Sequence, residues 1–170
     1  MNLVGRVWRF GDDINTDLIL PIPVVPLPLE DRPQHMFRAN RPGWAAEVRR
    51  GDILVAGRNY GMGSNRPAAQ VMRDLGLACL LAESINGLFL RSCVNYAFPA
   101  LEVVGVHEAF DEGDVAEVDF EAAVVTNART GAVLHGSPWP GMAIDVLKAG
   151  GLIQQLDAAG LLHPLGWAPD

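Results

Sequence analysis

A proline-rich apolar segment near the N-terminus limits the folds open to this chain. The run LILPIPVVPLPLEDRP, residues 18–33, contains five prolines among aliphatic residues. Proline lacks a backbone N–H and its ring clashes with the preceding helical turn, so neither a helix nor a central strand can continue through this run. The segment is nevertheless apolar. We therefore predict a long excursion from the body of the domain, with an apolar side that meets a partner or lines a pocket.

The chain beyond this excursion alternates between buried strands and helices. Pro67 suits the first turn of a helix and Gly76 suits its C-terminal cap, and the apolar residues between them share one face. Strands joined through helices favour a parallel sheet with right-handed crossovers. The predicted elements are strands over 4–10, 52–60, 77–83 and 100–104, a short helix from Trp44 to near Gly51, and helices over 67–75 and 84–96.

The pattern changes from Asp114 onward. Residues 114–136 alternate with period two around the turn NARTG, which predicts a β-hairpin. Two short helices follow, separated by Gly150 and Gly151. The 170 residues are enough for one domain with a substantial core. We predict a single α/β domain over residues 1–170, in which a mixed sheet has flanking helices and extra antiparallel strands.

The stretch NYGMGSNRPAAQVMRDLG, residues 59–76, places glycines and a serine between a strand and a helix. A helix start presents free N–H groups and a positive dipole to an anion, and Arg66 adds a guanidinium that matches a carboxylate. Ser64 supplies a hydroxyl in the same volume. The stretch therefore predicts a carboxylate or phosphate cradle. It equally fits a helix capped by Ser64 or Asn65 beside a solvated Arg66. It is neither a P-loop nor a GxGxxG motif.

Composition narrows the functional classes. The net charge of −7 argues against nucleic acid as a partner, while it leaves room for a small anionic substrate. Cys79 and Cys93 lie in apolar surroundings and are expected to be buried free thiols, too few for an iron–sulfur cluster. The four histidines show no metal-ligand spacing. We find no secretory signal and no run long enough to span a membrane, so we expect a cytoplasmic protein.

Three ordered motifs carry a family resemblance. They are GDDINTDLILP (residues 11–21), GDILVAGRNYGMGSNRPAA (51–69) and AESINGLFLRSCVNYAFPALEV (82–103). Together they resemble the swivelling domain of the aconitase superfamily, and most closely the 3-isopropylmalate dehydratase small-subunit family. The resemblance implies a swivelling β/β/α domain and the small chain of a hydro-lyase in leucine biosynthesis. It also implies a large subunit that carries a 4Fe–4S cluster, with no metal or other cofactor bound by this chain.

The resemblance also implies roles for individual residues. Ser64 corresponds to the family's serine base, which removes the α-proton of the substrate. Arg66 corresponds to the arginine that binds a substrate carboxylate, and Gly63 and Asn65 belong to the same substrate-binding loop. Asp17 lies in the family's TD motif and is expected to orient an arginine or the loop at the site. Structurally, Thr16 and Asp17 fit a stabilised turn equally well.

The chain departs from the family pattern at several positions. Asn65, Pro67 and Ala68 stand where the family has serine, glutamate and histidine. The proline-rich excursion lacks an arginine that contacts the variable group of the substrate, and Arg32, Arg38 and Arg41 are candidates to replace it. An apolar excursion favours 3-isopropylmalate or a close 2-alkylmalate as substrate. The departures also motivate an alternative: a non-catalytic carboxylate-binding or regulatory module that kept the fold.

Overall fold

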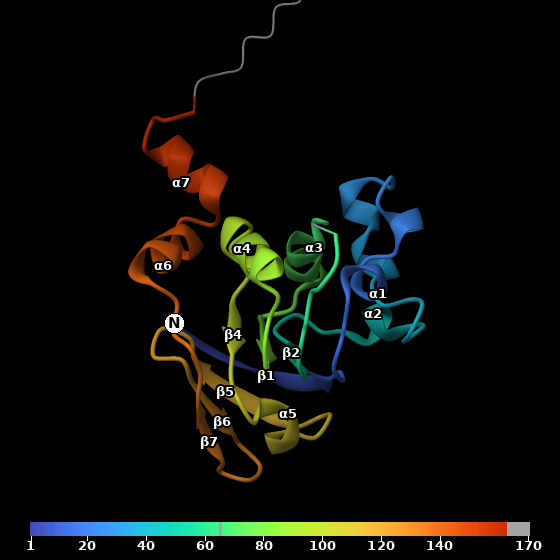
Figure 1. Cartoon of the computed structure of the whole chain (residues 1–170), viewed down its shortest axis with the longest axis vertical. Coiled ribbons are helices and arrows are strands. Elements are labelled where there is room, and N and C mark those ends of the chain that lie inside the picture. Colours follow the sequence, from blue (N-terminus) through green and yellow to red (C-terminus); the bar gives the residue numbers. More distant parts are fainter. Residues whose placement is uncertain (65, 163–170) are drawn as a thin grey trace, which may run out of the picture.

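The computed structural model describes residues 1–64 and 66–162. Within these residues the strands are β1 (Asn2–Arg9), β2 (Ile53–Ala56), β3 (Cys79–Ala82), β4 (Ala100–Glu102), β5 (Val115–Asp119), β6 (Val124–Asn127) and β7 (Val133–His135). They form a seven-stranded mixed sheet in the order β4-β3-β2-β1-β5-β6-β7 (Figure 1). The long strand β1 joins a parallel half to an antiparallel half, so the predicted α/β fold with a mixed sheet is confirmed.

The parallel half follows the predicted pattern of strands and crossover helices. Strand β1 pairs with β2 with Val7 opposite Ile53, and β3 and β4 continue the parallel ladder. Helices α3 (Ala68–Leu75) and α4 (Gly87–Asn95) connect these strands and cover one face of them (Figure 1). Every residue of β2 and β3 is buried, because helices or loops cover both faces; this explains their continuous apolar sequences.

The antiparallel half contains the predicted hairpin. Strand β5 pairs with β1 and β6, and β6 pairs with β7 across the turn that includes NARTG. Burial alternates along β5, because one face packs on the core and the other is exposed. Helices α6 (Gly141–Lys148) and α7 (Leu152–Ala158) follow as predicted. Sequence periodicity did not reveal α5 (Val106–Ala109), because a helix of four residues is too short to show one.

The proline-rich segment contains only short turns. Helix α1 (Thr16–Ile19) is followed by 3-10 turns at Ile22–Val24, Leu29–Asp31 and Pro33–His35, and then by α2 (Trp44–Glu47). The absence of a long regular element was predicted. Helix α2 ends at Glu47 instead of near Gly51, because the Asp52 carboxylate accepts a hydrogen bond from Arg49 N–H (2.9 Å) and holds the chain in a turn.

Much of the apolar side of this segment packs against the body of the same chain. Val24 of the segment is buried, and so are Met36 and Phe37, which follow it in the chain. The Phe37 ring lies 4.4 Å from that of Phe10 and 4.9 Å from that of Trp44, between ring centroids. The expectation that this side meets a partner or lines a pocket is therefore wrong for Val24, which belongs to the same buried cluster as these rings.

The core lies on both faces of the sheet. One cluster joins α3, α4 and the excursion, and the other joins α5 with the antiparallel strands. Cys79 and Cys93 lie in different clusters as buried free thiols, and burial raises the pKa of both.

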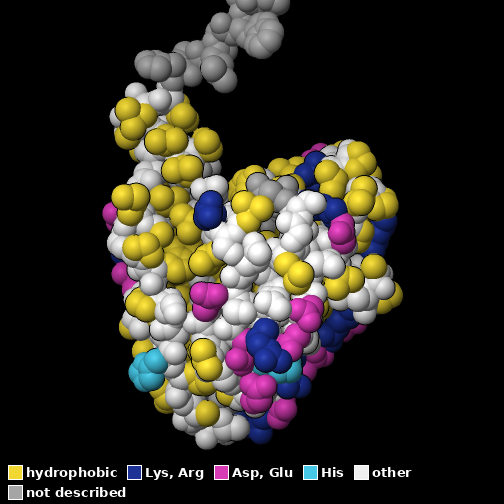
Figure 2. All heavy atoms as spheres, viewed as in Figure 1, with side chains coloured by type: hydrophobic (Ala, Val, Ile, Leu, Met, Phe, Trp, Pro, Cys, Tyr) yellow, Lys and Arg dark blue, Asp and Glu magenta, His cyan; other side chains and the backbone are white. Residues whose placement is uncertain are grey.

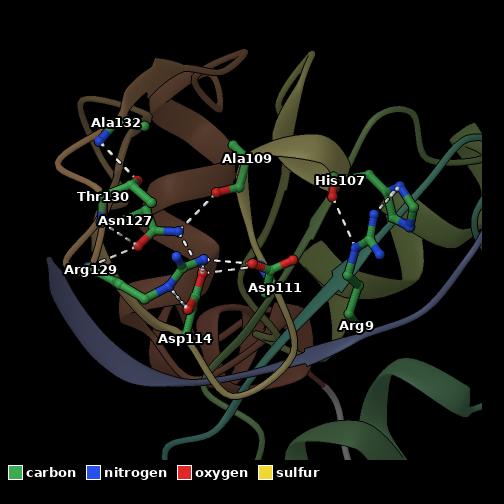
Figure 3. A network of polar contacts seen from close by, with 9 residues as sticks. All are labelled: Arg9, His107, Ala109, Asp111, Asp114, Asn127, Arg129, Thr130 and Ala132. Atoms are coloured by element: carbon green, nitrogen blue, oxygen red, sulfur yellow. Dashed lines mark hydrogen bonds and ion pairs between the residues drawn. The ribbon is translucent and has the colours of Figure 1, made fainter.

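A buried carboxylate fixes the antiparallel half (Figure 3). Asp114 accepts hydrogen bonds from the guanidinium of Arg129, from Asn127 Nδ2 (2.7 Å) and from the backbone N–H of Asp111 (3.0 Å). Asn127 also donates to the carbonyl of Ala109 (2.8 Å), so the network ties β6 to the end of α5. The Arg129 guanidinium, with these other donors, holds the pKa of Asp114 far below its usual range.

This low pKa predicts acid sensitivity. In the unfolded chain, Asp114 has an ordinary pKa of about 4, so its contribution to stability is complete above that pH and is lost as the pH falls below it. We expect Asp114→Asn to flatten the decrease in the free energy of unfolding between neutral and acid pH, measured by urea denaturation at several pH values. Asp157→Asn, the same charge change on the exposed part of α7, should leave the slope unchanged. An unchanged slope in Asp114→Asn would contradict the assignment.

Candidate functional site

The glycine loop, residues 57–66, extends from the end of β2 and is held from both sides. One neighbour is the segment that enters α1, and the other is the segment between β3 and α4. Its hydrogen bonds to them are Gly61 N to Ile14 O (2.7 Å), Thr16 N to Met62 O (2.8 Å), Tyr60 N to Ser84 O (3.1 Å) and Asn86 N to Tyr60 O (2.8 Å). Two of the three family-like motifs therefore flank the third in space.

The glycines at positions 61 and 63 are required by both conformation and space. Gly61 has φ +78° and Gly63 has φ +106°, in the left-handed region that favours glycine. A Cβ on Gly61 would lie 2.3 Å from Cγ of Phe89, and a Cβ on Gly63 would lie 3.0 Å from Oγ1 of Thr16. The glycines thus let the loop lie directly against α1 and α4.

Ser64 is exposed and does not cap the helix. Pro67 occupies the N-cap position of α3, and no side chain makes a capping hydrogen bond there. Ser64 lines a small hollow whose other lining residues are Thr16, Gly61, Gly63, Arg66, Leu88 and Phe89. The capping interpretation therefore does not hold for Ser64. Asn65, the other predicted cap and substrate contact, lies outside the described residues.

Arg66 is bound to the protein and is not free in solvent. Its side chain is 10% exposed and donates to the backbone carbonyl of Leu20 (2.7 Å) and more weakly to that of Thr16 (3.5 Å). Its other nitrogen forms an ion pair with Asp17. The structure thus brings together Asp17, Gly63, Ser64 and Arg66. Asp17 contacts an arginine of the site, the geometry that its expected orienting role requires.

Removal of this arginine should loosen the link between the glycine loop and α1. We expect Arg66→Ala to lower the free energy of unfolding by about 1–3 kcal/mol, because a largely buried guanidinium with charged and carbonyl partners is lost. Arg58→Ala is the matched control: the ion pair of Arg58 with Asp12 is exposed, at 72% and 43%, and should contribute at most about 1 kcal/mol. If urea denaturation shows that Arg66→Ala and Arg58→Ala lower the free energy of unfolding equally, Arg66 does not link the glycine loop to α1.

The other arginines considered for the site differ in their availability. Arg41 pairs with Glu112 and stacks over Trp8, with its Cζ 4.9 Å from the ring centroid, so it is engaged by β1 and by the segment before β5. Arg32 donates to the carbonyl of Leu27 (2.9 Å). Arg38 is exposed and forms no ion pair within the described part of the chain. Arg32 and Arg41 are thus engaged within the chain, and Arg38 is freer than they are to take the place of the missing loop arginine.

Sequence reasoning missed the apolar part of the hollow. Leu88 and Phe89 come from the start of α4, where Asn86 accepts a capping hydrogen bond from Leu88 N–H (3.0 Å). The sequence showed only an apolar helix there and no sign of which end meets the glycine loop. These two residues form the apolar part of a lining that also includes Arg66.

The surface is notched on this face of the molecule. In Figure 2, a deep notch separates an arm rich in apolar side chains, which contains α7, from the lobe formed by the segment from α1 to α2.

Over residues 1–64 and 66–162, no three metal-ligating side chains are grouped as a metal site would need. Those residues also contain no helix of the length and apolar character needed to cross a membrane.

Known proteins resemble this chain along most of its length. No protein-family model matches the sequence. The isopropylmalate/citramalate isomerase small subunit of Methanocaldococcus jannaschii is 38% identical, over 89% of this chain and 92% of that protein. The 3-isopropylmalate dehydratase small subunit 1 of Thermotoga maritima is 36% identical, over 92% and 95%. The methanogen homoaconitase small subunit of Methanothermobacter thermautotrophicus is 35% identical, over 88% and 87%.

The fold is also that of a solved structure. The crystal structure of a 3-isopropylmalate dehydratase chain from Methanocaldococcus jannaschii superposes with a TM-score of 0.87 at 26% identity. The superposition covers 95% of this chain and 96% of that one. Sequence and structure therefore point to the same group of proteins.

Proposed function

Because this chain belongs to the 3-isopropylmalate dehydratase small-subunit family, we propose that it is the small subunit of a two-chain hydro-lyase. The observation that carries the proposal is the placement of Ser64, exposed in a loop that ends beside Arg66 and the start of α3. The names of the relatives do not favour a non-catalytic module. They describe small subunits of isomerases, dehydratases and a homoaconitase.

In the proposed mechanism Ser64 reacts as the alkoxide, which accepts the α-proton of the substrate and becomes the hydroxyl. A serine alkoxide is high in energy in water, so it needs preorganised positive partners. The free N–H groups at the start of α3 and the guanidinium of Arg66 provide them. Arg66 binds a substrate carboxylate, and Asp17 together with the carbonyl of Leu20 holds the guanidinium in place.

The residues of this chain do not fit an iron–sulfur cluster. Cys79 and Cys93 are buried in separate core clusters, and no group of three metal ligands occurs in the described part of the chain. We therefore assign the 4Fe–4S cluster to a large subunit, where it would act as a Lewis acid toward the substrate hydroxyl. Together the two chains would form a cytoplasmic enzyme of leucine biosynthesis.

The hollow favours a substrate with a small apolar group. Leu88 and Phe89 form an apolar wall beside Ser64. A charged tail, as in homocitrate, would find no cation on that wall. We assign 3-isopropylmalate or a close 2-alkylmalate as the substrate.

Reconstitution tests the proposal. The chain is mixed anaerobically with an iron–sulfur large subunit of a 3-isopropylmalate dehydratase, and hydration and dehydration of 3-isopropylmalate and citramalate are followed. We expect turnover only when both chains are present. Calorimetry with the same dicarboxylates on the small chain alone distinguishes the enzyme subunit from the alternative, a non-catalytic binding module. A binding module is favoured if the small chain binds the dicarboxylates by itself and the mixture of the two chains shows no turnover.

A further inference from the structure

One buried hydroxyl in the candidate site has no hydrogen bond. Thr16 is 2% exposed, and its Oγ1 has no hydrogen-bond partner among the residues that the structure describes. The backbone of Thr16 is paired, since its N–H donates to Met62 O (2.8 Å) and its carbonyl accepts from Leu20 N–H (2.9 Å). Buried polar groups in native proteins are nearly always hydrogen-bonded, so this hydroxyl requires an explanation.

Helix α1 does not need the hydroxyl of Thr16. The N-cap of α1 is Asn15, whose side chain accepts a hydrogen bond from Leu18 N–H (2.9 Å). Thr16 is the first helical residue, so no preceding turn of α1 offers its hydroxyl a carbonyl. A valine would fill the same volume and would avoid the destabilisation caused by an unpaired buried hydroxyl.

The hydroxyl lies against the glycine loop. Its oxygen is the nearest atom to the position that a Cβ on Gly63 would occupy, at 3.0 Å, so the absence of a side chain at Gly63 leaves this oxygen directly against the backbone beside Ser64. Thr16 and Ser64 line the same hollow. The only unpaired side-chain group of α1 thus faces the loop that carries Ser64, within the part of the chain described by the structure.

We propose that Thr16 is a positioning residue for Ser64: in the assembled, substrate-bound enzyme its hydroxyl donates a hydrogen bond to the Ser64 oxygen and stabilises the deprotonated form that accepts the α-proton. The inference rests on the proposed function, which gives Ser64 the role of proton acceptor. Catalytic hydrogen bonds often form fully only in the complex with substrate, and a preorganised donor lowers the energy of an oxyanion in a site closed to water.

The test uses Thr16→Val and Thr16→Ser in the reconstituted two-chain enzyme and in the free small chain. We expect Thr16→Val to lower kcat by about 10²-fold with little change in KM, because loss of the donor makes the reactive, deprotonated form of Ser64 less accessible while the contacts that bind substrate remain. Thr16→Ser restores the hydroxyl and should recover most of kcat. The Tm of free Thr16→Val should equal or exceed that of the wild type. Thr126→Val on β6, far along the sheet, is the matched control and should leave kcat unchanged.

Two results would overturn the inference alone: wild-type kcat in Thr16→Val, or a lower Tm of the free Thr16→Val chain together with no recovery of kcat in Thr16→Ser. The first would show that the hydroxyl is dispensable, and the second that it is structural. If the wild-type mixture shows no turnover with a correctly folded small chain, the proposed function itself fails and this inference fails with it. Turnover of the wild-type mixture therefore distinguishes the two failures.

Discussion

Replacement of Ser64 by alanine should lower the kcat of the two-chain enzyme by about 10³- to 10⁴-fold, the upper part of the range for loss of a positioned general base. The physical reason is that no other hydroxyl among the residues lining the hollow is exposed at the end of the glycine loop. KM should change much less, because in the proposed mechanism it is Arg66 that binds the substrate carboxylate. The measurement is the steady-state hydration and dehydration rate of 3-isopropylmalate after anaerobic reconstitution.

Two controls make this result specific. Ser64 is exposed and makes no capping hydrogen bond to α3, so the Tm of the free Ser64→Ala chain should stay within about a degree of the wild type. Ser137→Ala, a change at an exposed serine after β7, should leave kcat unchanged. Unaltered turnover in Ser64→Ala would remove Ser64 from the mechanism, even if the two-chain hydro-lyase activity itself is found.

Gly61→Ala should cause a large loss of stability. Its Cβ would lie 2.3 Å from Cγ and 2.5 Å from Cβ of Phe89, so the ring or the loop must move. Left-handed backbone costs a residue with a side chain about 1–2 kcal/mol, and overpacking adds about 1–3 kcal/mol. We expect the free energy of unfolding to fall by about 2–5 kcal/mol, measured by urea denaturation of the free chain.

Gly113→Ala separates the two contributions. Gly113 has φ +91°, close to the conformation of Gly61, but a Cβ there would meet no atom within 4 Å. This variant should therefore lose only the backbone part, about 1–2 kcal/mol. If Gly61→Ala lowers the free energy of unfolding no more than Gly113→Ala does, the Phe89 ring moves aside without an energetic penalty. Close packing against α4 then does not hold the loop in place.

The local sequence predicted much of the architecture, because each prediction depended on short-range physics. The continuous apolar runs predicted buried parallel strands, and the period-two alternation after Asp114 predicted the hairpin. Pro67 and Gly76 bounded the helix α3 to within one residue. The prolines excluded long regular elements from residues 18–33. Each of these signals acts through the backbone of neighbouring residues and is therefore visible in sequence alone.

The site was predicted less completely. The strand–glycine–helix order and Arg66 indicated an anion cradle, while the roles of Ser64 and Asp17 came from family resemblance. Nothing in the sequence indicated that Arg66 bonds the carbonyl of Leu20 or that Leu88 lines the hollow. These contacts join α1, the glycine loop and α4, which are separated by about 20 to 50 residues in the chain.

The sequence by itself determined where this chain can be helical, where it must turn and which strands are buried, since backbone sterics and hydrophobic periodicity act over a few residues. Only the tertiary structure showed that Ser64 does not cap α3, and which partners Arg66 takes. It also left the hydroxyl of Thr16 buried, unpaired and against Gly63. Such a juxtaposition arises when distant segments pack, and no local pattern encodes it.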